Sequence, residues 1–211
     1  MKIVDIRADW IKIPLARGAS IATKSITERD YVIVRVKTED GIEGIGTALD
    51  GVLSYVSVQH VLAPMVIGQS IFDVKKIWDT MYRGTLLQGR RGSLVRGISA
   101  IDNAIWDAIG KTLNQPLCKV LGASREKVPC YYSVGYYMEG GTTEELAQDV
   151  KQYVDKGQRS VKIRTGGRSP EEDAERLCAV REAVGPDVNI MLDANNAWVD
   201  AHSAARALKL L

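Results

Sequence analysis

A strand–helix–strand pattern over residues 161–195 constrains the fold of this chain more than any other feature. It opens with SVKIRTGG, continues as a helical segment from Ser169 to Val184, and closes with a Gly-Pro turn and NIMLDANN. Short aliphatic runs bounded by turn residues predict strands, and the longer periodic segment between them predicts a helix. This order is the repeating unit of a parallel α/β architecture.

Charged and polar side chains mark the carboxyl ends of both predicted strands. Lys162 and Arg164 flank an isoleucine at the first strand end, and Asp193 and Asn195 flank an alanine at the second. Alternate residues of a strand share a face, so each pair is expected to point to one side of the sheet. Two cations and a carboxylate–amide pair at neighbouring strand ends favour a functional site over a core, because α/β sheets and barrels carry their chemistry there.

The N-terminal part predicts an antiparallel three-stranded meander. Residues 2–13, 31–37 and 42–49 are read as strands, and Glu39-Asp40-Gly41 is a hairpin turn signal. Pro14 is expected to end the first strand, and a polar loop is expected over residues 15–27. The glycines at positions 41, 44 and 46 do not have the spacing of a dinucleotide-binding turn, which argues against nucleotide binding.

The pattern becomes helical after this meander and later alternates between strand and helix. Helices are predicted over residues 53–66, 73–82 and 94–111, the last with an apolar face formed by Ile98, Ile101, Ile105, Trp106 and Ile109. Three βα units follow, with strands over 128–134, at 161 and over 189–193. The change in pattern marks a domain boundary, which divides the chain into residues 1–122 and 123–211.

Composition excludes several classes of protein. Lys and Arg number 28 against 26 Asp and Glu, so no net charge attracts the chain to nucleic acid or to a membrane. The N-terminus alternates like a strand instead of forming a signal peptide, and no apolar run approaches the roughly 18 residues of a membrane span. The three cysteines have no CxxC spacing, which argues against structural zinc and a disulfide framework. We expect a cytoplasmic protein.

One segment resembles a known family. Residues 99–111 read SAIDNAIWDAIGK and continue to Pro116-Leu117 and Leu121-Gly122. Together with the Lys-x-Arg and Asp-x-Asn strand ends, they resemble the mandelate racemase and muconate-lactonizing branch of the enolase superfamily, over essentially the whole chain. The resemblance implies an α+β capping domain in residues 1–122, with a three-stranded antiparallel meander plus helices. It implies the first three βα units of a (β/α)8 TIM-type barrel in residues 123–211.

The resemblance also implies a chemistry. Members of the superfamily abstract the proton α to a carboxylate and stabilise the enediolate with Mg²⁺. Asp193 matches the first of three acidic metal ligands, and Mg²⁺ prefers such hard oxygen ligands. Lys162 matches the first lysine of a Lys-x-Lys pattern, whose ammonium neutralises the substrate carboxylate. These two residues are therefore the expected metal ligand and catalytic cation.

Arg164 departs from the commonest pattern of the family. It stands where the second lysine acts as a base, yet a guanidinium is not deprotonated in proteins. We interpret Arg164 as a catalytic residue that acts electrostatically or needs special activation, with the main base elsewhere, such as a histidine on a later strand. This favours an acid-sugar dehydratase over a racemase, epimerase or cycloisomerase, which stay as the alternative.

Further residues are expected to bind the substrate. The resemblance suggests a mobile loop from Arg17 to Thr27 that closes over the substrate in the family. The expected substrate-binding residues are Asn195, Ser133, Ser20, Ile21 and Thr23.

The remaining machinery of the family has no counterpart in these residues. Its two further glutamate ligands and its histidine lie on later strands, so the chain is expected to be a fragment that is inactive alone. A non-catalytic remnant, or one half of a split assembly, is the alternative from another class. The expected partner is a small-molecule sugar acid. The full-length protein is expected to be a homo-oligomer built from dimers, as in the octamers of the family.

Overall fold

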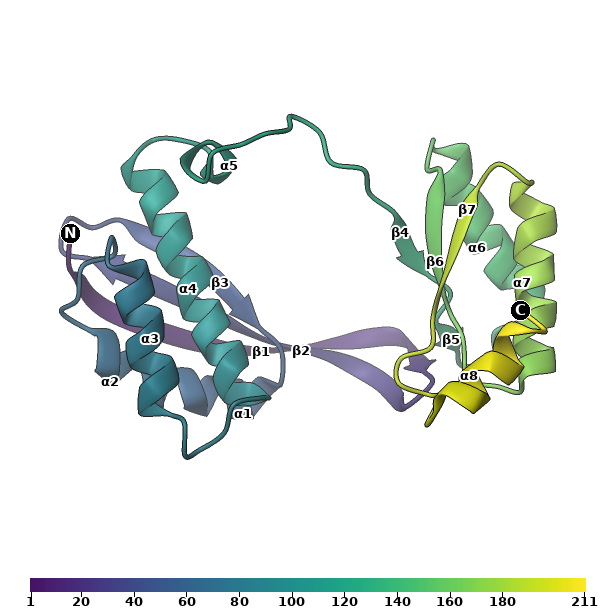
Figure 1. Cartoon of the computed structure of the whole chain (residues 1–211), viewed down its shortest axis with the longest axis horizontal. Helices are drawn as coiled ribbons and strands as arrows, with labels where there is room; N and C mark the ends of the chain where they lie inside the picture. The colour runs from purple at the N-terminus through teal and green to yellow at the C-terminus, as the bar shows by residue number, and fades with distance from the viewer. The chain divides into compact units, whose positions relative to one another are not determined.

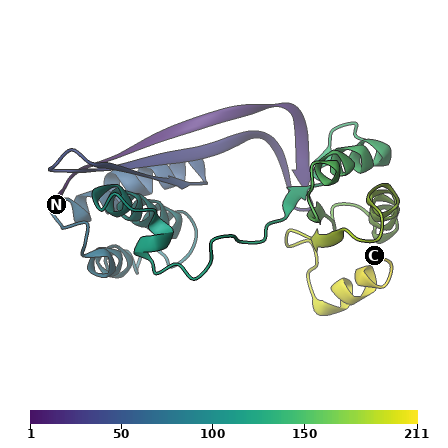
Figure 2. The same ribbon diagram turned by 90° about the horizontal axis from the view of Figure 1, so that it is seen from above.

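The computed structural model describes all 211 residues, which form two compact units (Figures 1 and 2). The first unit comprises Met1–Ile13 and Arg29–Glu126. The second comprises Pro14–Glu28 and Lys127–Leu211. Each unit therefore contains two separate stretches of sequence. None of the helices combines the length and the apolar character that a membrane crossing requires.

The first unit contains an antiparallel sheet covered on one face by helices (Figure 1). Strand β2 pairs with β3 in antiparallel register, from Val32 opposite Ala48 to Lys37 opposite Glu43. The strands that contribute to it are β1 (Ile3–Ile21), β2 (Lys24–Thr38) and β3 (Glu43–Ala48). The helices are α1 (Gly51–Val56), the π-helical turn η1 (Ser57–Leu62), α2 (Ala63–Val66), α3 (Val74–Gly84), α4 (Ser93–Thr112) and α5 (Leu117–Val120).

Helix α4 lies unusually close to strand β3. A Cβ atom at Gly44 would lie 1.9 Å from the carbonyl oxygen of Ala104, and one at Gly46 would lie 2.0 Å from that of Ala100. These two glycines therefore allow the helix backbone to approach the sheet. The predicted apolar face of the helix is confirmed, since its four isoleucines are buried and Trp106 is partly buried against the same core.

The second unit contains a parallel sheet with the strand order β4-β6-β7. Its strands are β4 (Tyr132–Val134), β6 (Ser160–Arg164) and β7 (Asn189–Asp193), and its helices are α6 (Thr143–Asp155), α7 (Pro170–Val184) and α8 (Ala201–Leu208). Val150 of α6 and Val180 of α7 share a core with Val161 and Ile163 of β6. The alternation of strand and helix predicted for this region is therefore observed.

The helices of this unit begin at capping residues. The hydroxyl of Thr142 accepts a hydrogen bond from the backbone N–H of Glu145, at 3.2 Å, at the start of α6. Ser169 and Glu172 form a reciprocal capping box at the start of α7. Each such cap satisfies N–H groups that have no partner within the helix.

The expectation of a loop over residues 15–27 is wrong. Strand β1 continues through Pro14 to Ile21, and β2 begins at Lys24, so the segment is the end of a long β-hairpin, called the arm (Pro14–Glu28) below. A proline is tolerated in a strand where its missing N–H faces away from a ladder partner. The arm exposes side chains on both faces and so lacks the alternation by which strands are recognised.

Two further strand boundaries differ from the prediction. Strand β4 begins only at Tyr132, and Val128, the expected first residue, is 77% exposed. The two-residue strand β5 (Tyr137–Met138) was not predicted. It pairs antiparallel with the arm, Ser20 opposite Tyr137 and Ala19 opposite Met138. A partner more than a hundred residues away leaves no local signal in so short a strand.

Candidate active site

Three charged side chains meet at the carboxyl ends of β6 and β7. Lys162 and Arg164 project from the same face of β6, and Arg164 lies opposite Asp193 in the parallel register. The Nζ atom of Lys162 lies 3.0 Å from Oδ2 of Asp193, and Nη1 of Arg164 contacts the same oxygen. Strand alternation therefore directs both cations towards one carboxylate.

The environment of these groups favours their charged forms. Burial alone would raise the pKa of Asp193, but hydrogen bonds from Lys162 and the Asn195 backbone, and the charge of Arg164, hold this pKa below its usual value. The hydrogen bond to Asp193 raises the pKa of Lys162 above its usual value. At neutral pH the cluster therefore holds an ammonium, a guanidinium and a carboxylate.

The guanidinium of Arg164 is held from several sides. Its Nη2 atom donates to the Ser133 hydroxyl and to the Tyr136 hydroxyl, each at 3.3 Å. The guanidinium carbon also lies 4.9 Å from the centre of the Tyr136 ring, within range of a cation–π contact. The Nε atom is buried without a hydrogen-bond partner. Only 10% of the Arg164 side chain is exposed, so this donor is shielded from solvent.

Tyrosines complete the surroundings of the two cations. The Nζ atom of Lys162 lies 5.3 Å from the centre of the Tyr131 ring. Ser133, a candidate from the sequence, and Tyr131 thus contact different cations. Tyr136 was missed by the sequence reasoning. The available signal was the run YYSVGYY, which places aromatic hydroxyls on both sides of the turn that follows β4.

Asn195 lies beyond the end of β7, so strand alternation does not set its direction. Its φ is 46°, in the left-handed region, and its backbone N–H donates to Oδ1 of Asp193 at 3.0 Å. This contact closes a turn that fixes the Asp193 carboxylate. The Oδ1 atom of Asn195 is buried without a hydrogen-bond partner.

The expected substrate-binding residues of the arm contact different parts of the second unit. The hydroxyl of Thr23 donates to the carbonyl of Asn195 at 3.1 Å and so reaches the end of β7. The hydroxyl of Ser20 instead contacts the carbonyl of Tyr137 in β5, at 3.4 Å. Ile21 lies between them at the end of β1 and is half-buried. Within the second unit, the arm therefore contacts both β5 and the turn after β7.

The acidic residues of the chain do not make a complete magnesium site. Mg²⁺ takes six oxygen ligands in octahedral geometry. Asp193 provides a carboxylate of the right class, but both of its oxygens already accept hydrogen bonds within the protein. No three His, Cys, Asp or Glu side chains of the 211 residues gather where they could hold a metal ion. The residues present thus supply one ligand only.

The sequence and the fold both match known proteins. Residues 5–122 match the family described as "Mandelate racemase / muconate lactonizing enzyme, N-terminal domain", and residues 145–211 match "Enolase C-terminal domain-like". The first match alone covers more than half of the chain. The chain belongs to the mandelate racemase/muconate lactonizing enzyme family of the enolase superfamily. The superfamily relatives that it matches are enzymes.

Several family members illustrate the similarity. An arabinonate dehydratase of Saccharolobus solfataricus is 39% identical over 186 residues, which are 85% of this chain and 49% of the relative. An L-talarate/galactarate dehydratase of Salmonella typhimurium is 32% identical over 215 residues, covering 95% of this chain and 53% of the relative. The crystal structure of a racemase from Streptomyces coelicolor with bound magnesium has a TM-score of 0.91 and 28% identity, covering 99% of this chain and 59% of that one.

The family members differ from the chain in length and from one another in reaction. It spans about half the length of the curated relatives it matches. Other matched members are racemases, epimerases and cycloisomerases, so the family includes several reactions.

Proposed function

We propose that the protein to which these residues belong abstracts the proton α to a carboxylate with the help of Mg²⁺, and that it dehydrates an acid sugar. The observation that carries the proposal is the meeting of Lys162, Arg164 and Asp193 at neighbouring strand ends. The similarity to an arabinonate dehydratase and to a talarate/galactarate dehydratase supports a sugar-acid substrate.

In this proposal Lys162 is a fixed cation. When the α proton leaves, negative charge develops on the carboxylate oxygens of the substrate, and a preorganised ammonium stabilises it. The hydrogen bond to Asp193 keeps the ammonium charged and in place. Its proposed role is therefore electrostatic and does not include proton abstraction.

In this proposal Arg164 favours dehydration over the other reactions of the family. Racemisation needs a base on each face of the α carbon, and a guanidinium is not deprotonated in proteins. Dehydration needs one base for the α proton and a donor for the departing β hydroxyl. The base takes the α proton, and the C–H electron pair forms the new double bond as the C–O bond breaks. The departing hydroxyl takes a proton from a general acid outside these residues and leaves as water, and the enol rearranges to a 2-keto acid. Arg164, oriented by Ser133 and Tyr136, would donate hydrogen bonds during this step.

The remaining parts of the machinery are assigned as follows. A bound Mg²⁺ would withdraw charge from the substrate carboxylate. Asp193 would supply one ligand, while the other ligands and the base would lie outside these 211 residues. We infer that residues 1–122 form a capping domain and that residues 123–211 hold the first three βα units of a (β/α)8 barrel. The proposed contacts to the substrate are Asn195, Ser133, Ser20, Ile21 and Thr23.

Racemisation or epimerisation is the second candidate. An N-succinyl-L-Arg/Lys racemase of Bacillus cereus aligns with the whole chain at 30% identity. A racemase would exchange the α proton and invert its carbon without releasing water. The two candidates therefore predict different products from the same first step.

Expression of the complete reading frame that encodes these residues tests the proposal. Aldonic and aldaric acids are incubated with Mg²⁺, and 2-keto acids are detected as semicarbazones. A 2-keto acid is the expected product, whereas inversion in D₂O without a keto acid would favour the racemase. If no substrate yields a 2-keto acid or an inverted product, both candidates are contradicted.

The variant Arg164→Lys tests the role of the guanidinium. A lysine keeps the charge and can also act as a base, so exchange of the α proton with D₂O is expected to stay unchanged or to rise. Complete loss of substrate binding in this variant would contradict the electrostatic role. The matched control is Arg181→Lys, which removes a guanidinium near the C-terminal end of α7.

A further inference from the structure

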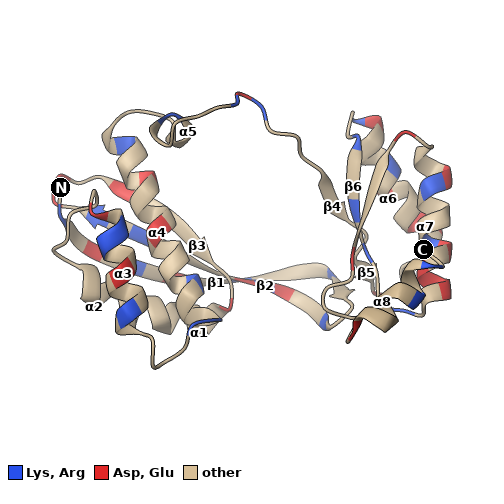
Figure 3. Ribbon diagram, viewed as in Figure 1, with Lys and Arg blue, Asp and Glu red and all other residues tan.

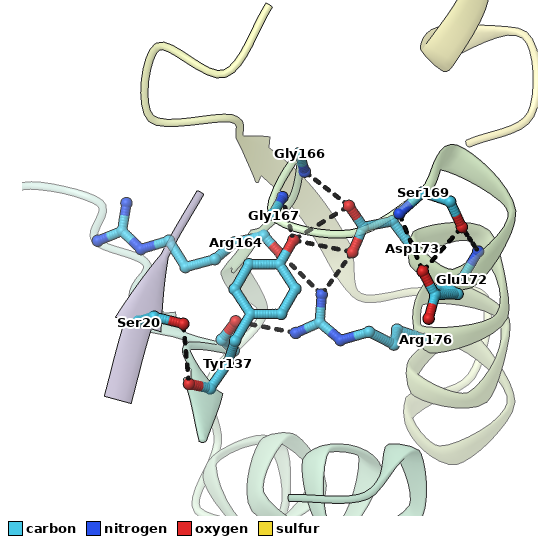
Figure 4. A network of polar contacts seen from close by, with 10 residues as sticks. Ser20, Tyr137, Arg164, Gly166, Gly167, Ser169, Glu172, Asp173 and Arg176 are labelled. Carbon is cyan, nitrogen blue, oxygen red and sulfur yellow. Dashed lines mark hydrogen bonds and ion pairs between the residues drawn. The ribbon is translucent and has the colours of Figure 1, made fainter. Parts of the chain in front are cut away.

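We propose that Arg176 is a positioning residue for Arg164, and that Tyr137 connects the arm to the same network. The network comprises Tyr137, Asp173 and Arg176 and is called the buried triad below (Figure 4). None of these residues was singled out in the sequence. The catalytic role of Arg164 rests on the proposed function, but the positioning of its backbone does not.

The first observation is the burial of the triad. Asp173 is 1% exposed, Arg176 is 6% exposed and Tyr137 is 8% exposed. A buried charge is costly unless it is paired and hydrogen-bonded. Arg176 donates to Asp173 through Nη1 at 2.8 Å. Asp173 also accepts from the Tyr137 hydroxyl at 2.8 Å and from the Gly166 N–H at 2.6 Å.

The second observation is where the guanidinium of Arg176 points. Nη1 donates to the carbonyl of Arg164 at 3.0 Å, and Nη2 donates to the carbonyl of Gly135 at 3.1 Å. These carbonyls lie at the carboxyl ends of β6 and β4, the strands that carry Arg164 and Ser133. One planar guanidinium therefore holds two neighbouring strand ends in a fixed relationship.

The third observation is the place of Tyr137. Its ring centre lies 4.1 Å from the guanidinium carbon of Arg176, and its hydroxyl accepts from the Gly167 N–H at 2.9 Å. A Cβ atom at Gly167 would lie 2.5 Å from the ring, so only glycine fits there without a shift. The backbone of Tyr137 pairs with Ser20 of the arm. Tyr137 thus contacts the arm through its backbone and the triad through its side chain.

These contacts form a continuous path between two parts of the second unit. The arm pairs with β5, the Tyr137 hydroxyl reaches Asp173, Asp173 holds Arg176, and Arg176 holds the backbone of Arg164 (Figure 4). The position of the arm therefore influences the orientation of the Arg164 guanidinium. This gives the buried triad a role in the site as well as in the core.

The Nε–H of Arg164 provides a direct probe, because it is buried without a hydrogen-bond partner. Its resonance in ¹⁵N spectra of the 211-residue chain is assigned by its loss in Arg164→Lys. In Arg176→Lys the charge beside Asp173 stays, but an ammonium cannot span both carbonyls in the plane of a guanidinium. We expect this resonance to shift and its exchange with water to rise about tenfold, because local opening becomes easier.

Arg181→Lys is the matched control on the same helix. Arg181 Nη1 donates to the carbonyls of Gly185 and Val188, each at 2.7 Å, at the other end of α7. This variant is expected to leave the Arg164 resonance unchanged. An unshifted resonance in Arg176→Lys, or an equal shift in Arg181→Lys, would overturn the positioning role. If Arg176→Lys does not fold, Tyr137→Phe takes its place, since it removes only the hydroxyl.

A double-mutant cycle tests the connection to the arm. Ser20→Pro removes a backbone donor and disturbs the pairing of β1 with β5. It is expected to shift the Arg164 resonance in the parent chain and to shift it less in the Tyr137→Phe background. Equal shifts in both backgrounds would show that the arm acts independently of the triad and would overturn the connection. Neither measurement requires turnover, so a failure here is distinct from a failure of the proposed reaction.

Discussion

Lys162 and Asp193 face each other across neighbouring parallel strands, with Nζ 3.0 Å from Oδ2. The ribbon of β6 is blue in Figure 3 where its Lys and Arg residues lie. The carboxylate is thus neutralised by the protein's own cations, which determines how it responds to acid and to metal ions.

Protonation of Asp193 is expected to destabilise the chain. The pKa of Asp193 is lowered in the folded state. The stability that its carboxylate contributes is therefore complete above the unfolded pKa of about 3.9, and it is lost as the pH falls through the folded pKa. Asp193→Asn is expected to cost about 1–3 kcal/mol at neutral pH, as for hydrogen bonds to charged groups. Urea unfolding at a series of pH values should show this difference shrinking towards pH 3. A difference that does not change with pH would contradict the ion pairing.

The isolated 211-residue chain is expected to bind Mg²⁺ weakly and to show no turnover. One carboxylate that is already paired with two cations cannot replace the water ligands of the ion, so we expect a dissociation constant of roughly 1 mM or weaker. Titration calorimetry with MgCl₂ measures it, and Asp193→Asn is the control. Tight binding, or dehydration of a sugar acid by this chain alone, would show that the site is more complete than proposed.

Tyr137 is expected to ionise well after an ordinary tyrosine. Burial is the main cause that raises its pKa to about 12, and the neighbouring Asp173 adds to the effect. The stability that the neutral phenol contributes is fully present below its unfolded pKa of about 10. It is lost as the pH rises from this value through the pKa of the folded state. Absorbance at the tyrosinate band should show one late ionisation that is missing in Tyr137→Phe. An identical titration of both proteins would contradict the burial of this phenol.

Gly46→Ala is expected to destabilise the first unit strongly. The added methyl group would lie 2.0 Å from the carbonyl oxygen of Ala100, so α4 and β3 must separate. Forced overpacking of this kind typically costs about 1–3 kcal/mol, and more where backbone has to move. Chemical denaturation measures the loss. Thr47→Ala, on the exposed face of the same strand, should cost less than about 1 kcal/mol.

The sequence predicted those parts of the fold that have a local physical signal. The buried face of α4 repeats at the helical period. Alternation in β6 placed Lys162 and Arg164 on one face, as observed. In each case the signal and the structure involve neighbouring residues of the chain.

The parts that were not predicted depend on distant partners. Asp173 and Arg176 are charged residues on a helix and would ordinarily be assigned to its exposed side, but each satisfies the other inside the fold. The arm was read as a loop because its strands lack a buried face. Tyr136 was not recognised because its contact with Arg164 joins two strand ends that only the folded sheet brings together.

The division of the second unit into two stretches of sequence has a consequence for how such proteins can be recombined. Residues 14–28 are encoded within the N-terminal region, yet they pair with β5 and reach the turn that holds Asp193. An exchange of N-terminal regions between two relatives therefore also exchanges these contacts. The charged residues and the strands of the arm are encoded in different parts of the gene. Recombination can therefore change the arm while it leaves the charged residues unchanged.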